Sequence, residues 1–270
     1  MSSFGARLRQ ASAAHGRLCV GIDPHPGLLT AWGLDVSADG ARRFGLAVVR
    51  AAASRVGVVK PQVAFFERYG SAGFAALEEV IGSARAAGLI VIADAKRGDI
   101  GSTMQGYAEA WLAPGAALEA DALTVSPYLG VGALADTARF ALAHGKGLFV
   151  LAATSNPEAA GLQRAATATG VPVAAQVCAQ VRALDVDGSL GVVIGATCDR
   201  DAFGLSDAAL TGLPVLAPGF GHQGAALSDL GRLFGPAAPE VLASASRSIL
   251  SAGPDGLAEA IETHQSELEA

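Results

Sequence analysis

Eight short runs of apolar, largely β-branched residues recur along the chain, with helical periodicity between them. The runs are nearly continuous in apolar residues, as expected of parallel strands that are buried on both faces. The predicted strands are 18–23, 57–60, 89–96, 122–126, 147–153, 190–196, 214–218 and 240–244. The clearest predicted helices are 41–55, 73–87, 133–144, 174–184 and 256–267.

This alternation predicts the fold class, α/β, and favours a single (β/α)8 TIM barrel. A doubly wound sheet is the competing architecture, because the same alternation builds it, but a count of eight strands favours the barrel. No Ser/Gly linker, low-complexity tract or sustained charge run interrupts the sequence. We therefore expect one barrel domain over residues 1–270.

Composition excludes several classes of protein. Apolar residues make up 51% of the chain and the mean hydropathy is +0.40, yet every apolar run is interrupted too early for a transmembrane helix. The N-terminus lacks the apolar stretch of a secretory signal, so we expect a cytoplasmic protein. A net charge of -6 argues against a nucleic-acid partner, which would normally face a basic surface.

Cysteine and histidine spacing indicates no metal site. The three cysteines Cys19, Cys178 and Cys198 show no C-x-x-C pattern, and the five histidines show no H-x-x-H pattern. We expect small, buried, reduced thiols and no bound metal.

An unusual charged segment, D-A-K-R-G-D-I, directly follows the apolar residues of the third predicted strand. Alternate side chains of a strand share one face, so Asp94 and Lys96 are expected to lie side by side. Such a pair alone is usually an ordinary surface salt bridge. Lysine is nevertheless rare here, with 16 Arg but only three Lys, and two of the three, Lys60 and Lys96, end predicted strands.

Polar residues lie at or directly after the ends of several predicted strands, including those just named. In a TIM barrel the C-terminal strand ends converge on one rim, which carries the chemistry. Each of these residues alone could be a cap or a loop residue, but together they predict a polar pocket. They are Asp23, Lys60, Asp94, Lys96, Ser126 and Thr154.

A glycine-rich stretch at 219–224 satisfies G-x-G-x-x-G after the seventh predicted strand. A dinucleotide site also needs an acid that closes the next strand, whereas Glu240 opens it. In a barrel, the loops after strands seven and eight commonly cradle a phosphate, and Arg247 could contact phosphate oxygens there. A phosphate site is therefore favoured over a dinucleotide site.

The segments D-A-K-R-G-D-I-G-S-T at 94–103 and T-S-N-P at 154–157 resemble the orotidine 5'-phosphate decarboxylase family, in particular its bacterial type 2 subfamily. The likeness covers nearly the whole chain. It implies decarboxylation of orotidine 5'-monophosphate (OMP) to UMP, the last step of de novo UMP synthesis. It also implies a homodimer that uses no metal or organic cofactor.

The resemblance assigns a charged catalytic array to Lys60, Asp94, Lys96 and Asp99. Lys96 would give its proton to C6 of the pyrimidine as general acid. Asp99 would enter the active site of the neighbouring subunit, and Ile100 and Thr103 would reach that same site.

The resemblance also implies the contacts to the substrate. Asp23 would accept hydrogen bonds from ribose hydroxyls, and Ser126 would read the pyrimidine edge. Gln223 and Arg247 would grip the phosphate, with 221–234 as the closing loop.

Three rival functions remain open. A Mg²⁺-dependent 3-keto-L-gulonate 6-phosphate decarboxylase shares D-x-K-x-x-D, but Mg²⁺ takes oxygen ligands and strand two ends in Lys60. An NAD-dependent oxidoreductase rests only on the glycines at 219–224. A catalytically silent phosphate-binding barrel would bind UMP and leave OMP unchanged.

Overall fold

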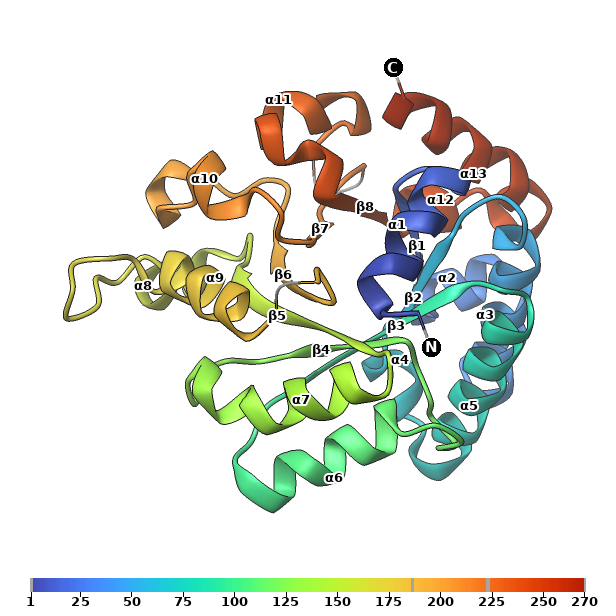
Figure 1. Cartoon of the computed structure of the whole chain (residues 1–270). Coiled ribbons are helices and arrows are strands. Elements are labelled where there is room, and N and C mark those ends of the chain that lie inside the picture. The colour runs from blue at the N-terminus through green and yellow to red at the C-terminus, as the bar shows by residue number, and fades with distance from the viewer. Residues whose placement is uncertain (1, 186, 222–223, 270) are drawn as a thin grey trace.

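The computed structural model describes residues 2–185, 187–221 and 224–269, and contains a closed ring of parallel strands surrounded by helices (Figure 1). Each strand pairs with the next in sequence and β8 pairs with β1. The predicted (β/α)8 TIM barrel is confirmed, and its closure excludes the doubly wound sheet. The strands are β1 (Leu18–Ile22), β2 (Val58–Pro61), β3 (Ile90–Arg97), β4 (Ala122–Val125), β5 (Gly147–Ala153), β6 (Leu190–Ile194), β7 (Val215–Pro218) and β8 (Val241–Ala245).

Helices cover the outer face of the barrel (Figure 1). Among the described residues, short 3-10 segments also occur at Val131–Leu134, Pro157–Ala159, Asp201–Phe203, Leu227–Asp229 and Gly235–Glu240. No helix in the described ranges is long and apolar enough to cross a membrane. The α-helices are α1 (Phe4–His15), α2 (Pro26–Ala31), α3 (Ala38–Ala52), α4 (Ala64–Glu67), α5 (Gly70–Ala86), α6 (Gly101–Leu112), α7 (Ala135–Ala143), α8 (Ala160–Gln163), α9 (Val173–Leu184), α10 (Asp207–Leu210), α11 (Leu230–Phe234), α12 (Arg247–Leu250) and α13 (Gly253–Glu269).

Helix boundaries differ from the predicted ones by a few residues, for local reasons. Helix α3 begins three residues before the predicted start, because the Ser37 hydroxyl accepts a hydrogen bond from the Gly40 N–H at 3.1 Å and caps the helix. Helix α7 begins two residues after the predicted start, because a 3-10 turn occupies Val131–Leu134.

Both faces of the strands are buried, in two separate apolar layers. The outer layer lies between strands and helices and is the larger of the two. This double burial explains why the strands are nearly continuous in apolar residues. The inner layer fills the barrel and contains Cys19, Val58, Ile90, Ile92, Ala122, Phe149, Val193, Leu216 and Leu242.

Helix α1 closes one end of the barrel and lies over the middle of the strand ring in Figure 1. Phe4 meets Phe149 edge to face, with ring centroids 6.1 Å apart, and Leu8 adds to the same cluster. Gly147 allows this approach, because a Cβ there would lie 2.3 Å from the Phe4 ring. The N-terminal end of the barrel is thus filled with side chains.

Replacing Phe149 by alanine removes the side chain that joins the inner layer to α1. We expect Phe149→Ala to lower the free energy of unfolding by about 3–5 kcal/mol, through lost burial and the cavity left behind. Urea denaturation measures the change. Leu162→Ala, at a residue that is 51% exposed, is the control and should cost less than about 0.5 kcal/mol. Equal losses in the two variants would contradict the expectation.

Candidate active site

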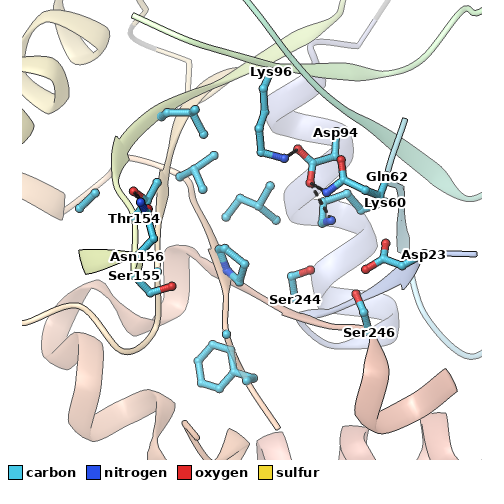
Figure 2. A pocket seen from close by; sticks show the side chains of 18 of the residues that line it. Asp23, Lys60, Gln62, Asp94, Lys96, Thr154, Ser155, Asn156, Ser244 and Ser246 are labelled. Carbon is cyan, nitrogen blue, oxygen red and sulfur yellow. Dashed lines mark hydrogen bonds and ion pairs between the residues drawn. The ribbon is translucent and has the colours of Figure 1, made fainter. Parts of the chain in front are cut away.

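A cavity of about 270 Å³ lies at the C-terminal strand ends, opposite α1. Figure 2 shows Asp23, Lys60, Asp94 and Lys96 on one side of it, with residues 154–156 facing them from the loop after β5. Apolar side chains of the barrel interior, Leu151, Val193 and Leu216, also line it. The cavity therefore has one charged wall and an apolar lining beside it.

The Asp94 carboxylate is the centre of the charged wall. Its Oδ2 accepts hydrogen bonds from Lys60 Nζ and Gln62 Nε2, both at 3.0 Å. Its Oδ1 accepts from Lys96 Nζ at 2.5 Å and from the Thr124 hydroxyl at 3.0 Å. Four donors fill the acceptor capacity of an ionised carboxylate. Asp94 and Lys60 are buried, whereas the Lys96 side chain is 45% exposed.

The buried pair stays ionised because the partners outweigh desolvation. Burial is the largest influence on Asp94 and opposes its charge, yet Lys60 and Lys96 hold the pKa of Asp94 well below its ordinary value. Burial likewise opposes the charge on Lys60, but Asp94 and Asp23 together raise the pKa of Lys60 above its ordinary value. Both groups are therefore charged at neutral pH.

Lys96 does not continue a regular strand. Its φ is +50°, in the left-handed region that non-glycine residues rarely adopt. The pairing of β3 with β4 shifts between Ala93 and Arg97, which marks a bulge. The expected meeting of Asp94 and Lys96 is observed, but the expectation of simple alternation is wrong, because a bulge directs Lys96.

Polar groups continue along the cavity towards β8. Asp23 Oδ1 is buried and has no hydrogen-bond partner within residues 2–185, 187–221 and 224–269, so it can accept a bond from a ligand hydroxyl. Ser246 packs against Gly21, where a Cβ would lie 1.8 Å from its hydroxyl oxygen. Ser244, Ser246 and Arg247 line this end, and Arg247 is exposed.

A sequence model described as "Orotidine 5'-phosphate decarboxylase / HUMPS family" matches residues 16–262. The chain belongs to this family. The orotidine 5'-phosphate decarboxylase of Salinispora arenicola is 55% identical over 259 residues, which cover 94% of this chain and 92% of that protein.

Solved structures agree with the sequence comparison. A crystal structure of a Streptomyces avermitilis protein has a TM-score of 0.94 and 47% identity, and covers 100% of this chain and 95% of that one. The structure of Leishmania donovani OMP decarboxylase has a TM-score of 0.76 and 28% identity, with 99% of each chain covered.

These comparisons confirm two predictions, the family and a carboxy-lyase enzyme. The names of the curated relatives give no support to the NAD-dependent alternative. The Mg²⁺-dependent alternative is not favoured, because the curated relatives that are 50–55% identical are named orotidine 5'-phosphate decarboxylase.

Within the described residues, the cavity collects five of the site residues expected for an orotidine 5'-phosphate decarboxylase. Asp99, Ile100 and Thr103 lie at the start of α6, outside the cavity lining, and the Asp99 carboxylate accepts a hydrogen bond from the Ile100 N–H at 2.8 Å. Gln223 lies outside the described residues. The five in the cavity are Asp23, Lys60, Asp94, Lys96 and Arg247.

Ser126 is not among the residues that line the cavity, and its contact with a pyrimidine edge stays a prediction. Strand β4 ends at Val125, and the Ser126 N–H donates to the Arg97 carbonyl at 2.7 Å. This bond links Ser126 to the residue at which β3 resumes its pairing with β4. The polar residues that face the charged wall instead follow β5, at 154–156 (Figure 2).

Sequence reasoning missed Gln62 and Thr124, which complete the shell around Asp94. Gln62 follows Lys60 by two positions, so strand alternation could have placed it on the same face. Thr124 precedes Ser126 by two positions, but a threonine inside an apolar strand gives no polar signal of its own.

Neither metal nor thiol chemistry is suggested by the described side chains. Among them, no group of three His, Cys, Asp or Glu could hold a metal ion. Burial raises the pKa of the Cys19 and Cys178 thiols to about 12, so both are protonated at neutral pH.

Removing the charge of Asp94 tests the electrostatics of this wall. We expect Asp94→Asn to lower the free energy of unfolding at pH 7 by about 3–5 kcal/mol, because Lys60 loses its buried counter-charge. The pKa of Asp94 is depressed in the folded state, so its stabilisation is complete above about pH 5 and is lost as pH falls through the lower folded value. The gap between wild type and Asp94→Asn should therefore shrink towards pH 3.

Urea denaturation at pH 7, 5 and 3 measures that gap. Asp136→Asn is the control, because Asp136 forms an ion pair with Arg139 that is largely exposed. It should change stability little at any pH. A gap for Asp94→Asn that stays constant down to pH 3 would show that Asp94 is not held ionised by its partners.

Proposed function

We propose that this chain converts OMP to UMP and CO2 without a metal or an organic cofactor, as the last step of de novo UMP synthesis in the cytoplasm. The carrying observation is the Lys96 ammonium, which reaches the cavity and is held 2.5 Å from the buried Asp94 carboxylate. An acid fixed in this way suits a reaction that develops negative charge at one carbon.

In the proposed step, the bond between pyrimidine C6 and the substrate carboxylate breaks, and CO2 leaves. The electron pair stays on C6, and Lys96 Nζ transfers a proton to it. Lys96 then regains a proton from solvent, so atoms and charge balance. The ammonium acts first as an electrostatic stabiliser of the developing carbanion and then as general acid.

Asp94 and Lys60 support Lys96. Asp94 holds the Lys96 side chain in place, and repulsion between Asp94 and the substrate carboxylate is relieved when CO2 departs. The buried Lys60 Nζ lies 3.0 Å from Oδ2, the other carboxylate oxygen of Asp94. Lys60 therefore neutralises Asp94 and limits the cost of burying that carboxylate.

The remaining contacts fit a nucleoside monophosphate. The unpartnered Asp23 oxygen would accept a hydrogen bond from a ribose hydroxyl. Arg247, at the far end of the cavity, would bind the phosphate, with Gln223 as its partner in that role. Residues 154–156 face the charged wall and would contact the pyrimidine.

A direct assay tests the proposal. Adding OMP to protein treated with EDTA should give the ultraviolet absorbance change of conversion to UMP, at the rate seen with untreated protein. The donors around Asp94 are ammonium, amide and hydroxyl groups, which leave the carboxylate no lone pair for Mg²⁺. Absence of turnover would exclude the proposed reaction, and loss of turnover on EDTA treatment would exclude its cofactor-free form.

We further propose a homodimer in which Asp99, Ile100 and Thr103 complete the partner's active site. The loops after β3 and β4 support this, because they expose apolar side chains: Ile100 is 61% exposed, Tyr128 78% and Leu129 53%. A group of exposed apolar side chains on one rim is typical of an interface.

Mixing two inactive variants tests the shared site. Lys96→Ala and Asp99→Ala should each abolish turnover, because each removes a charge from every site. After unfolding and refolding an equal mixture, about one quarter of all sites should regain both residues, since half the dimers are mixed and each has one intact site. An equal mixture that stays inactive would contradict sharing, as would full activity of Asp99→Ala.

A further inference from the structure

Thr124 lies on β4, behind the charged wall, and is 1% exposed. Within the described ranges it is not one of the residues that line the cavity. Its hydroxyl nevertheless makes two hydrogen bonds to the catalytic pair. It accepts from the Lys96 N–H at 2.9 Å and donates to Asp94 Oδ1 at 3.0 Å.

Chemistry fixes the direction of both bonds. A backbone N–H can only donate, and an ionised carboxylate can only accept. The one hydroxyl proton of Thr124 must therefore point to Asp94, while a lone pair receives the Lys96 N–H. Each bond polarises the next in such a chain, which strengthens both.

The two bonds close a ring around Lys96. The ring runs from the Lys96 N–H through the Thr124 hydroxyl to Asp94 Oδ1, and returns through Lys96 Nζ at 2.5 Å. One hydroxyl thus holds both the backbone of Lys96 and the carboxylate that binds its side chain.

The bulge in β3 explains why a side chain is needed here. Regular pairing of β3 with β4 breaks between Ala93 and Arg97, so the Thr124 hydroxyl takes the Lys96 N–H in place of a strand carbonyl. A buried backbone N–H without an acceptor is costly, and the left-handed φ of Lys96 adds backbone strain. Threonine suits this position because β-branching restricts χ1 in a strand.

We propose that Thr124 is a positioning residue that holds Lys96 in its left-handed conformation and so aims the ammonium at C6 of the substrate. This role rests on the proposed OMP decarboxylation. Thr124 touches no substrate. Its effect on the reaction passes through Lys96 and Asp94.

The matched pair Thr124→Val and Thr124→Ser tests the role. Valine keeps the shape and removes the hydroxyl, whereas serine keeps the hydroxyl. We expect Thr124→Val to lower kcat by about 10- to 100-fold, because small misplacements of a catalytic group have effects of that size. KM for OMP should change less than about threefold, and Thr124→Ser should stay within about threefold of wild type in kcat.

Thr137→Val controls for the loss of a buried threonine hydroxyl, because Thr137 is also 1% exposed but lies on α7, away from the site. It should leave kcat unchanged even if it lowers the melting temperature. If Thr124→Val does not fold, Thr124→Ala replaces it, since alanine removes the hydroxyl without adding bulk.

Crystal structures of wild type and Thr124→Val without substrate give a readout that does not depend on activity. We expect Lys96 of the variant to leave the left-handed region or its Nζ to move beyond about 3.5 Å from Asp94 Oδ1. A Lys96 that stays in place overturns the proposal, as does a kcat within threefold of wild type. If wild type does not decarboxylate OMP, the proposed function fails, and the crystal structures alone decide the role of Thr124.

Discussion

A carboxylate buried between two ammonium groups determines the arrangement of the whole cavity. Asp94 has donors from three adjacent strands or the loops after them, with Lys60 and Gln62 on the β2 side and Thr124 on the β4 side. An unpaired ion at this depth would cost several kcal/mol. The register of the barrel supplies the partners, since Gln62 pairs directly with Asp94 across the β2–β3 boundary. The fold therefore stabilises a charge that it would otherwise exclude.

The barrel also controls where water reaches these charges. The inner apolar layer and α1 fill the opposite end, with Phe4 packed on Phe149, and the polar cavity opens at the C-terminal strand ends. The low polarity beneath Asp94 strengthens its attraction for both lysines. Lys60 is enclosed by this environment, while Lys96 stays 45% exposed. Because of this difference in exposure, Lys60 can only neutralise Asp94, whereas Lys96 is accessible to a substrate and to solvent protons.

The sequence predicted the strands better than the helices. It also predicted the charged residues of the cavity better than the polar residues that hydrogen-bond to them. All eight strands were predictable because burial on both faces leaves a continuous apolar run. Helices as short as α2 and α12 carry too few turns for a periodic signal. Lys60, Asp94 and Lys96 could be placed together from the sequence because lysine is rare in this chain and because the C-terminal strand ends of a barrel converge on one rim. The bulge at Lys96 was not predictable, since it depends on how β3 pairs with β4. The same pairing brings the Thr124 hydroxyl to Asp94 and Lys96.

The strain at Lys96 connects the fold with the chemistry. A left-handed backbone costs a non-glycine residue about 1–2 kcal/mol, and it persists only where the surroundings fix it. At Lys96 the surroundings are the Asp94 carboxylate with its hydrogen-bond donors, the Thr124 hydroxyl, and the pairing of β3 with β4 that resumes at Arg97. A flexible surface loop could not hold that conformation, whereas the end of a barrel strand can. The rigidity that the barrel gains from burial is therefore concentrated at Lys96, the group that we propose as the proton donor to C6 of the substrate.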